Sequence, residues 1–326
     1  MSDTKTRIGV IGTGGISYCH LGAYAADERV RLVGMADVDL DRAHRAASEF
    51  AARAYGDYVE MLDAERPDAV SICTPPLAHK APALEAIKRR INVFCEKPLA
   101  YSAADAREMV EAARERGALL MTAFCHRFHE PVVKAKALLA RGRLGRVLMY
   151  RNRFGGRIPM EGRWFGEKAV AGGGALLDTS IHSVDLFRFL VGEVAEVSAL
   201  TDTLAQRVDV EDSAAVLLRS RDGAIGVIEA SWSTPFGVNS IEIYGERGAA
   251  IVDYDQNRLR YRAEGMKRWR AVKPKGPDRF TLEVRHLVDC VRGESQPQIT
   301  GEDGLKAQLI IEAAYRSATD GARITL

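Results

Sequence analysis

The first 123 residues alternate short apolar runs with helical patterns, and this alternation limits the possible folds more than any other feature. The apolar, strand-like runs lie at residues 7–11, 31–36, 67–73, 92–95 and 118–123. The helical patterns between them lie at residues 17–26, 39–52, 57–63, 77–90 and 102–116. Strands that alternate with helices predict a parallel, doubly wound α/β sheet. Ligands of such sheets bind beyond the carboxyl ends of the strands.

The first of these strand ends has the glycine pattern of a dinucleotide site. The strand runs into Gly12-Thr13-Gly14-Gly15-Ile16-Ser17, and a helix follows. Gly12 permits a tight turn, and Gly14 lets a pyrophosphate approach the backbone while the helix N-terminus supplies amide donors. Ser17 stands where the fingerprint has Gly or Ala, and it is small enough for close packing. We therefore expect Gly12, Gly14, Gly15 and Ile16 to bind a cofactor.

An acidic residue stands where a ribose ligand is expected. Asp37 ends the second strand, 20 residues beyond Ser17. A carboxylate there accepts hydrogen bonds from the ribose hydroxyls and repels a 2′-phosphate, which favours NAD over NADP. The alternative is that Asp37 caps the helix that starts near Asp39.

Two further strand ends carry Thr74-Pro75-Pro76 and Glu96-Lys97-Pro98. Lys97 follows an apolar strand, where a lysine is expected only if its amine faces a cleft. The alternative is that Lys97 is an ordinary surface lysine. Pro98 disfavours helical backbone angles at Lys97. The sequence leaves open whether the Lys97–Pro98 bond is cis or trans.

After residue 123 the pattern changes to closely spaced strands. Strand-like runs lie at residues 146–154, 195–202, 211–219, 224–233, 239–244, 249–254 and 259–262. Short turns such as Asp222-Gly223 separate many of them, which predicts hairpins and a largely antiparallel sheet. Residues 280–292 and 302–319 read as closing helices. We therefore expect two domains, a cofactor-binding domain at 1–123 and a substrate and oligomerisation domain at 124–326.

A glycine run in the second half precedes a group of polar residues. After Gly172-Gly173-Gly174 the chain reads as one helix, in which Asp178, His182 and Asp185 recur at helical spacing. Residues three and four apart share a helix face. Bare backbone permits close approach of another molecule, and an acid beside an imidazole can transfer protons. Surface polarity and a metal site are the alternatives.

Taken together, these motifs resemble the Gfo/Idh/MocA oxidoreductases, named for glucose–fructose oxidoreductase and inositol dehydrogenase. The resemblance spans essentially the whole chain. It implies an N-terminal Rossmann domain and a C-terminal α/β domain whose open sheet face forms dimers or tetramers. It also implies that Lys97, Asp178 and His182 line the substrate site. The remaining residues it suggests are Thr74, Pro75, His79, Glu96 and Lys97 for the cofactor, and Arg127, Arg153 and Trp164 for the substrate.

The resulting hypothesis is an NAD-dependent dehydrogenase that acts on a secondary hydroxyl of a sugar or cyclitol. His182 is expected to act as general base, Lys97 to stabilise the alkoxide, and Asp178 to orient His182 or bind a neighbouring hydroxyl. No metal is required. The alternatives are a glycoside hydrolase of the same family that retains its NAD, and a sugar sensor without turnover.

Composition sets the remaining expectations. The formal net charge of +2 gives no case for a nucleic-acid or membrane partner. The five cysteines are odd in number and lack metal-type spacing, which is typical of a reducing compartment. The first seven residues, Met1 to Arg7, contain no signal peptide pattern, so we expect a cytoplasmic protein.

Overall fold

The computed structural model describes residues 5–326, so residues 1–4 of the N-terminal segment lie outside it. The chain divides into two compact units. The first comprises residues up to 125 together with 277–305, and the second comprises 126–276 together with 306–326. Segment 277–305 thus belongs to the first unit, although the sequence-based division at 123/124 assigned it to the second domain. The division of function between the two domains stays a prediction.

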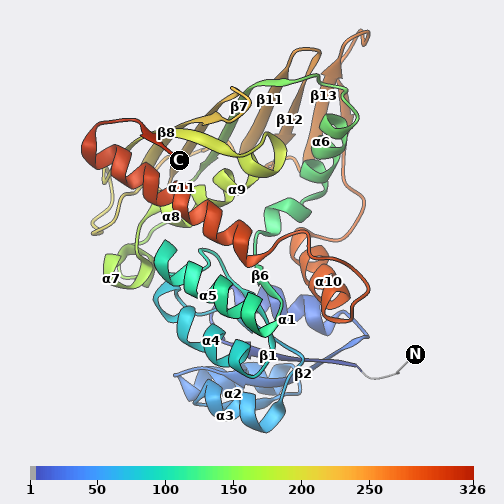
Figure 1. Ribbon diagram of the computed structural model, residues 1–326, viewed down its shortest axis with the longest axis vertical. Coiled ribbons are helices and arrows are strands. Elements are labelled where there is room, and N and C mark those ends of the chain that lie inside the picture. The colour runs from blue at the N-terminus through green and yellow to red at the C-terminus, as the bar shows by residue number, and fades with distance from the viewer. Residues whose placement is uncertain (1–4) are drawn as a thin grey trace. The chain divides into compact units, whose positions relative to one another are not determined.

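The first unit contains a six-stranded parallel sheet (Figure 1). Its order β3-β2-β1-β4-β5-β6 is that of a dinucleotide-binding Rossmann fold. The strands are β1 (Thr6–Ile11), β2 (Val30–Ala36), β3 (Arg53–Tyr55), β4 (Ala69–Ile72), β5 (Asn92–Cys95) and β6 (Leu120–Thr122). The helices are α1 (Ser17–Ala25), α2 (Leu40–Glu49), α3 (Tyr58–Glu65), α4 (Lys80–Lys88), α5 (Ala103–Arg116) and α10 (Arg279–Val291).

Local sequence accounts for where several of these helices begin and end. The side chains of Asp39, Asp57 and Ser102 each accept a backbone N–H at the start of α2, α3 and α5. Gly117 ends α5 with a left-handed backbone conformation. The central strands have side chains such as Val10, Val70 and Val93 that are fully buried. A parallel sheet that is covered on both faces requires such continuous apolar strands.

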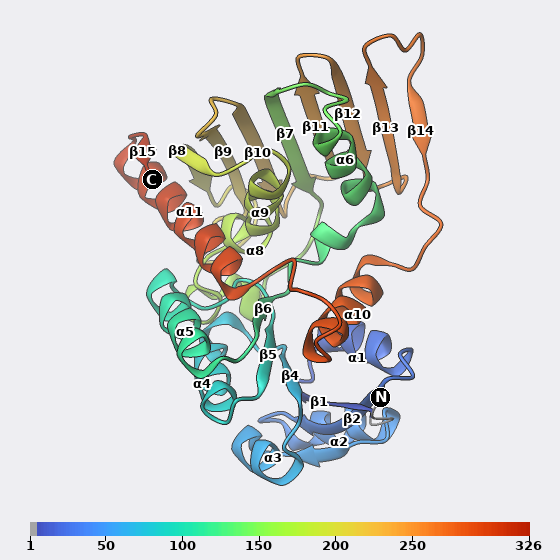
Figure 2. The same ribbon diagram turned by 45° about the vertical axis from the view of Figure 1, so that its right-hand side comes forward.

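The second unit contains a nine-stranded sheet of order β14-β13-β12-β11-β7-β10-β9-β8-β15 (Figure 2). Its strands are β7 (Val147–Gly155), β8 (Val194–Asp202), β9 (Ser213–Ser220), β10 (Ile225–Ser231), β11 (Ser240–Gly245), β12 (Gly248–Asp253), β13 (Arg258–Ala263), β14 (Arg270–Val272) and β15 (Ile324–Thr325). All neighbours pair antiparallel except β7 and β10. The largely antiparallel sheet is therefore confirmed.

Helices cover one face of this second sheet. They include α6 (Glu130–Ala140), α8 (Ala175–Asp178) and α9 (Ser180–Leu190), while α7 (Lys168–Ala171) precedes the glycine run. Helix α11 (Gly301–Asp320) is the last helix and is followed by strand β15. Phe187 of α9 fits over Gly226 of β10, where a Cβ would lie 2.5 Å from its ring. The opposite sheet face carries exposed side chains from alternate positions. Within the described residues, no helix is both long and apolar enough to cross a bilayer.

Candidate active site

The glycine turn of the first unit leaves room for a ligand. Gly12 has φ +86°, and a Cβ on it would lie 2.8 Å from the backbone of Cys73 and Thr74, so only glycine fits there. A Cβ on Gly14 or Gly15 would instead meet no atom within 4 Å. Helix α1 begins without a side-chain cap, so its first amides can serve an anion. These residues fit the pyrophosphate of a dinucleotide.

Asp37 lies beside this turn. Its carboxylate accepts hydrogen bonds from the Thr13 N–H (2.8 Å) and the Thr13 hydroxyl (3.0 Å). Asp39, rather than Asp37, caps helix α2 by accepting the Arg42 N–H. Asp37 is therefore placed next to the glycine turn, where a ribose ligand is needed, and its role in cofactor binding stays a prediction.

His79 joins the loops that follow β4 and β5. Its ring is fully buried, with Nδ1 2.9 Å from the Pro98 carbonyl oxygen and Nε2 2.7 Å from the Thr74 carbonyl oxygen. Burial lowers the pKa of His79. The neutral ring carries one N–H, so it donates to one of the two carbonyls at a time. These contacts support the backbone at Thr74 and Pro98, while the predicted contacts of Thr74, Pro75 and His79 with the cofactor stay predictions.

Glu96 has its partners in the interior of the first unit. Its carboxylate is 3.0 Å from His20 Nε2 and accepts the Lys97 backbone N–H at 3.0 Å. His20 also stacks on Phe94 and lies 3.4 Å from the Ser71 hydroxyl. Burial by itself lowers the pKa of His20, but Cys73 and the Glu96 carboxylate outweigh it and raise that pKa to about 10. This buried ion pair supports the loop at Lys97 from within, and sequence reasoning missed His20 because nothing marks it in helix α1.

The Lys97–Pro98 peptide bond, which the sequence left open, is cis. Lys97 is the second residue after β5, at the carboxyl edge of the parallel sheet. Its predicted contacts with the cofactor and the substrate stay predictions.

In the second unit, contacts within the protein account for the glycine run. Gly172 has φ +85° and ends α7. A Cβ on Gly173 would lie 2.1 Å from the Tyr315 hydroxyl, and one on Gly174 would lie 1.9 Å from the Glu211 carbonyl oxygen. The expectation that these glycines are bare so that another molecule can approach is therefore corrected. Gly173 and Gly174 are glycines because Tyr315 and Glu211 pack where a side chain would be.

Glu211 also holds the start of α8. One carboxylate oxygen accepts the N–H groups of Gly174 (3.0 Å) and Leu176 (2.9 Å) and the Tyr315 hydroxyl (2.8 Å). A carboxylate is favourable at a helix N-terminus. The single helix expected over residues 176–190 is instead two helices, α8 and α9, which meet at Thr179. The Thr179 hydroxyl accepts a hydrogen bond from Trp232 Nε1 at this junction.

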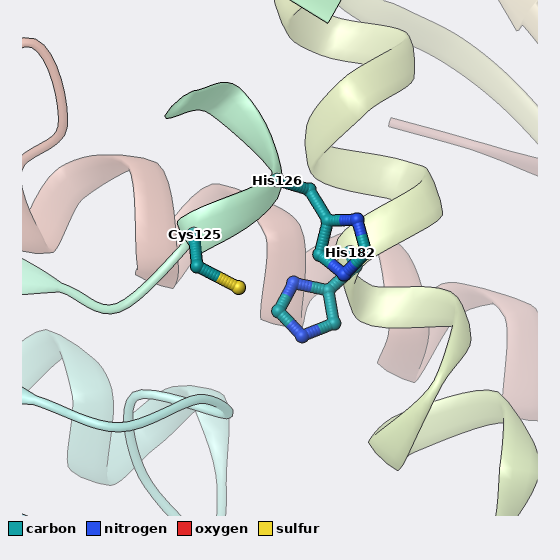
Figure 3. A group of neighbouring side chains, drawn as sticks. All are labelled: Cys125, His126 and His182. Atoms are coloured by element: carbon teal, nitrogen blue, oxygen red, sulfur yellow. The ribbon is translucent and has the colours of Figure 1, made fainter. Parts of the chain in front are cut away.

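His182 lies in the first turn of α9, against a second imidazole. The ring centroids of His182 and His126 are 4.5 Å apart (Figure 3). His126 Nδ1 lies 2.9 Å from the Tyr254 hydroxyl, and Tyr254 stacks on His129. Sequence reasoning did not place these residues together, because Tyr254 reaches the group from the turn after β12. Asp178 ends α8, four residues before His182.

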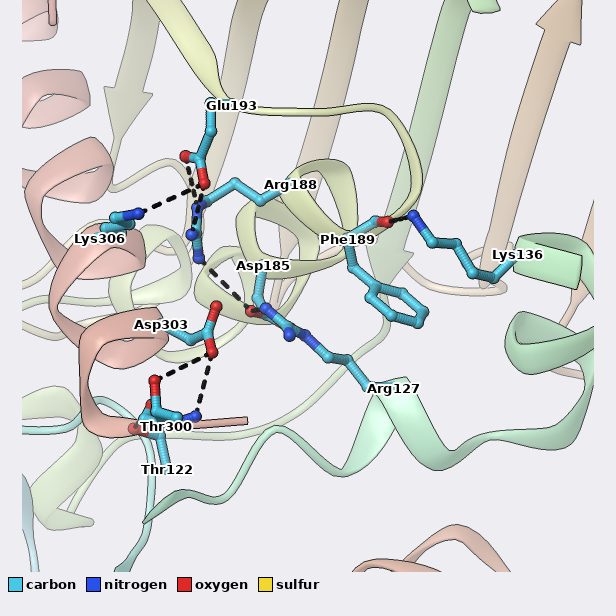
Figure 4. Close-up of polar contacts among 10 residues, drawn as sticks. All are labelled: Thr122, Arg127, Lys136, Asp185, Arg188, Phe189, Glu193, Thr300, Asp303 and Lys306. Carbon is cyan, nitrogen blue, oxygen red and sulfur yellow. Dashed lines mark hydrogen bonds and ion pairs between the residues drawn. The ribbon is translucent and has the colours of Figure 1, made fainter. Parts of the chain in front are cut away.

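Asp185 and Arg127 form a buried ion pair (Figure 4). Arg127 Nε and Nη2 donate to the two Asp185 carboxylate oxygens at 2.8 and 2.5 Å. The exposed fractions are 7% for Arg127 and 1% for Asp185. The alternative interpretation of this helix was a metal site formed by Asp178, His182 and Asp185. Because Asp185 is paired with Arg127, it does not contribute to such a site. The predicted contact of Arg127 with substrate stays a prediction, although these bonds give it a structural role.

Arg153 lies on the other face of the sheet. Its guanidinium pairs with Glu242 at 2.9 Å, and both side chains are on the open face. Its neighbour Phe154 faces inward and contacts the His126 ring, with centroids 5.2 Å apart. Successive strand residues point to opposite faces, so Arg153 points away from His182. Its predicted contact with the substrate stays a prediction, which this orientation does not support.

Trp164 lies in a short helical turn, Trp164–Gly166, and stacks on Phe165. Phe165 packs against a buried cluster that includes Trp232 and Ala175. The predicted role of Trp164 beside the nicotinamide stays a prediction.

Comparisons with known proteins agree with this architecture. Residues 6–124 match an oxidoreductase family with an NAD-binding Rossmann fold, and residues 132–251 match the GFO/IDH/MocA C-terminal domain. The myo-inositol 2-dehydrogenase of Thermotoga maritima is 28% identical over 341 residues, with 98% of each chain covered. The D-apiose dehydrogenase of Paraburkholderia graminis is 28% identical over 338 residues, with 97% of this chain and 88% of the relative covered.

A solved structure extends the likeness to the whole chain. The WlbA dehydrogenase from Bordetella pertussis, in complex with NADH and UDP-GlcNAcA, is 31% identical with a TM-score of 0.90. The match covers 100% of this chain and 99% of that chain. The family models account for both units, and the chain belongs to the Gfo/Idh/MocA family of oxidoreductases.

Proposed function

We propose that this protein is an NAD-dependent dehydrogenase that acts on a secondary hydroxyl of a sugar or cyclitol. The observation that carries the proposal is the open space above Gly14 and Gly15, at the end of β1 in a family of oxidoreductases. The relatives include dehydrogenases of inositol and of apiose, which supports this class of substrate.

The preference for NAD over NADP rests on Asp37. Its carboxylate already accepts two hydrogen bonds from Thr13 beside the glycine turn. A negative charge at this place binds ribose hydroxyls and repels a 2′-phosphate.

The proposed chemistry divides between three side chains. Bound NAD supplies the hydride acceptor. His182 accepts the proton of the substrate hydroxyl as general base, and the Lys97 ammonium donates a hydrogen bond to the same oxygen as negative charge develops. Asp178 orients His182 or accepts a hydrogen bond from a neighbouring hydroxyl. Since the Lys97 ammonium provides the electrophilic charge, the proposed reaction needs no metal ion.

We also propose that the protein is a homodimer or homotetramer that works in the cytoplasm. The open face of the second sheet carries the apolar side chains of Leu200, Leu217 and Ile225, which are 77%, 55% and 40% exposed. It also borders a hollow of about 680 Å³. Exposed apolar patches of this kind mark interaction surfaces. The five free cysteines support a reducing compartment.

The test is NADH formation by the purified protein with NAD and a panel of free sugars, inositols, anhydrosugars and nucleotide sugars, with NADP in parallel. We expect turnover with at least one polyol. His182→Asn should lower kcat by at least about 10²-fold with little effect on NADH binding, because general-base catalysis contributes about that much. Near-normal turnover in this variant would remove His182 from the mechanism. If the whole panel gave no NADH while NAD bound normally, the dehydrogenase proposal would fail and glycosides would be tried next.

A further inference from the structure

A hollow of about 1090 Å³ lies in the first unit, at the edge of the parallel sheet where its strands begin. Residues at the start of β1, β4 and β5 line it, together with the C-terminal ends of α3, α4 and α10. Every lining residue belongs to the first unit. The glycine turn follows the opposite end of β1, so the hollow is separate from the proposed cofactor site.

Positive charge predominates in the lining of this hollow. Its acidic residues are Asp63, Asp68 and Glu294, and its cationic residues are Lys5, Arg7, Arg66, Arg89, Arg90 and Arg292. Six cations against three acids leave an excess of three positive charges, although the formal net charge of the whole chain is only +2. A concave surface with charge of one sign attracts ligands of the opposite sign, so the hollow favours an anion.

Two of the arginines have their guanidinium groups available. Other lining arginines pair with acids, Arg89 Nε with Asp63 at 2.7 Å and Arg292 Nε with Glu294 at 2.7 Å. The side chains of Arg66 and Arg90 form no hydrogen bond or ion pair within residues 5–326, which the structure describes. All of their N–H donors can therefore serve a ligand.

Arg66 and Arg90 also have left-handed backbone conformations, with φ +42° and +59°. Arg66 directly follows α3, where its N–H donates to the Leu62 carbonyl at 3.1 Å. Arg90 lies two residues after α4, and its N–H donates to the Ile87 carbonyl at 2.8 Å. Glycine is the usual residue at such helix ends, because a Cβ makes the left-handed conformation unfavourable. Two arginines at positions that favour glycine indicate a use for their side chains.

We propose that this hollow binds a small anion that carries two or more phosphate groups. A guanidinium donates two parallel hydrogen bonds to one phosphate, so Arg66 and Arg90 can each hold a phosphate group. Buried Leu62 and Ile91 form an apolar part of the lining. Ligand pockets have volumes of roughly 300–1000 Å³, so a single phosphate would fill little of this hollow. The binding does not depend on the proposed dehydrogenase function.

Binding is tested by calorimetry on the full-length protein, with inorganic pyrophosphate as the first probe. We expect saturable binding that Arg66→Asn and Arg90→Asn each weaken by at least about tenfold, because each removes hydrogen bonds between charged groups. Arg116→Gln is the matched control: it removes the same charge from the last turn of α5, which does not line the hollow. This control should bind pyrophosphate like the wild type. Absence of binding, or equal affinity in all variants, would overturn the site.

ADP as a second probe distinguishes the sources of the phosphate groups. Tighter binding of ADP than of pyrophosphate, lost in the same two variants, would assign a nucleotide. Equal affinity for the two probes, lost in the same way, would assign the inorganic anion. Pyrophosphate bound at the glycine turn would be insensitive to both arginine variants, because that turn lies at the other end of β1.

Thermal melts separate this proposal from a purely structural role of the two arginines. A cation is favourable near a helix C-terminus, so under that alternative both asparagine variants should melt at lower temperature and bind pyrophosphate like the wild type. Asparagine tolerates the left-handed conformation, so we expect them instead to melt no lower than the wild type. Pyrophosphate should raise the melting temperature of the wild type and of Arg116→Gln. An equal rise in Arg66→Asn and Arg90→Asn would contradict the proposal.

Discussion

At the scale of the residue, glycines in similar runs have different physical reasons. Gly14 and Gly15 face open space, whereas Gly173 and Gly174 are packed against Tyr315 and Glu211. Both runs look alike in the sequence, because a glycine needed for a ligand and a glycine needed for packing are the same letter. Only the neighbouring atoms separate the two cases.

Replacement of Gly174 tests this distinction. In Gly174→Ala the new Cβ would lie 1.9 Å from the Glu211 carbonyl oxygen, so backbone must move. We expect the free energy of unfolding to fall by about 1–3 kcal/mol or more, as for other overpacked sites, in urea denaturation. Gly22→Ala in helix α1 is the control, because a Cβ there meets nothing within 4 Å. A loss of stability no larger than that of the control would contradict the packing role.

Asp37 carries a second prediction at this scale. Asp37→Ala should weaken NAD binding and raise the kcat/KM ratio of NADP to NAD by at least about tenfold, because the charge that repels a 2′-phosphate is gone. Asp39→Ala removes a nearby carboxylate that caps α2 instead. This control should lower stability slightly and leave the cofactor ratio unchanged. An unchanged ratio in both variants would refute the ribose role of Asp37.

At the scale of the element, buried polar contacts hold the loops at the strand ends. His20 of α1 and Glu96 after β5 form an ion pair in which both side chains are buried. His79 lies between the carbonyls of Thr74 and Pro98 and donates to one of them at a time. The sequence identified these loops as functional, but not the interior groups that support them. A buried polar partner follows no periodic pattern, so periodicity cannot reveal it.

The His20–Glu96 pair predicts a dependence of stability on pH. The pKa of His20 rises from an ordinary 6.5 to about 10 in the folded protein. The folded state therefore keeps a proton that the unfolded state loses, and this contribution is full below pH 6.5 and disappears as pH rises to about 10. Cys73 and Glu96 together raise this pKa. In Glu96→Gln only Cys73 opposes the effect of burial, so the pKa of His20 should fall and urea denaturation should show less loss of stability over this range.

Glu65→Gln is the control for this measurement. Glu65 is also buried and ion-paired, but its partners are Arg7 and Arg53 rather than a histidine. It should lose stability and keep the alkaline decline of the wild type. Equal declines in the wild type and Glu96→Gln would show that the Glu96 carboxylate does not raise the pKa of His20.

At the scale of the whole molecule, the open face of the second sheet predicts self-association. Leu217→Glu places a charge at the centre of the exposed apolar residues and should shift the protein toward monomer in sedimentation velocity. Val133→Glu is the control, since Val133 is 46% exposed on helix α6, on the covered side of the sheet. A wild-type protein that is monomeric at micromolar concentration would contradict this prediction.

The sequence by itself determined the class and order of the elements. Alternation of strands and helices predicted the parallel sheet, and closely spaced strands predicted the largely antiparallel one; both are confirmed. The parallel pair of β7 and β10 and the short strands β3 and β14 were not foreseen. These patterns are local, because a strand or helix repeats its buried positions every two or 3.6 residues.

Only the tertiary structure decided which polar groups meet. It paired Arg127 with Asp185 and Arg153 with Glu242, so that Arg153 faces away from His182. It also placed His126 between His182 and Tyr254, which are far apart in the chain. Such pairings depend on strand register and on the face of the sheet that a helix covers. Both are set by packing over the whole unit, and no short stretch of sequence contains them.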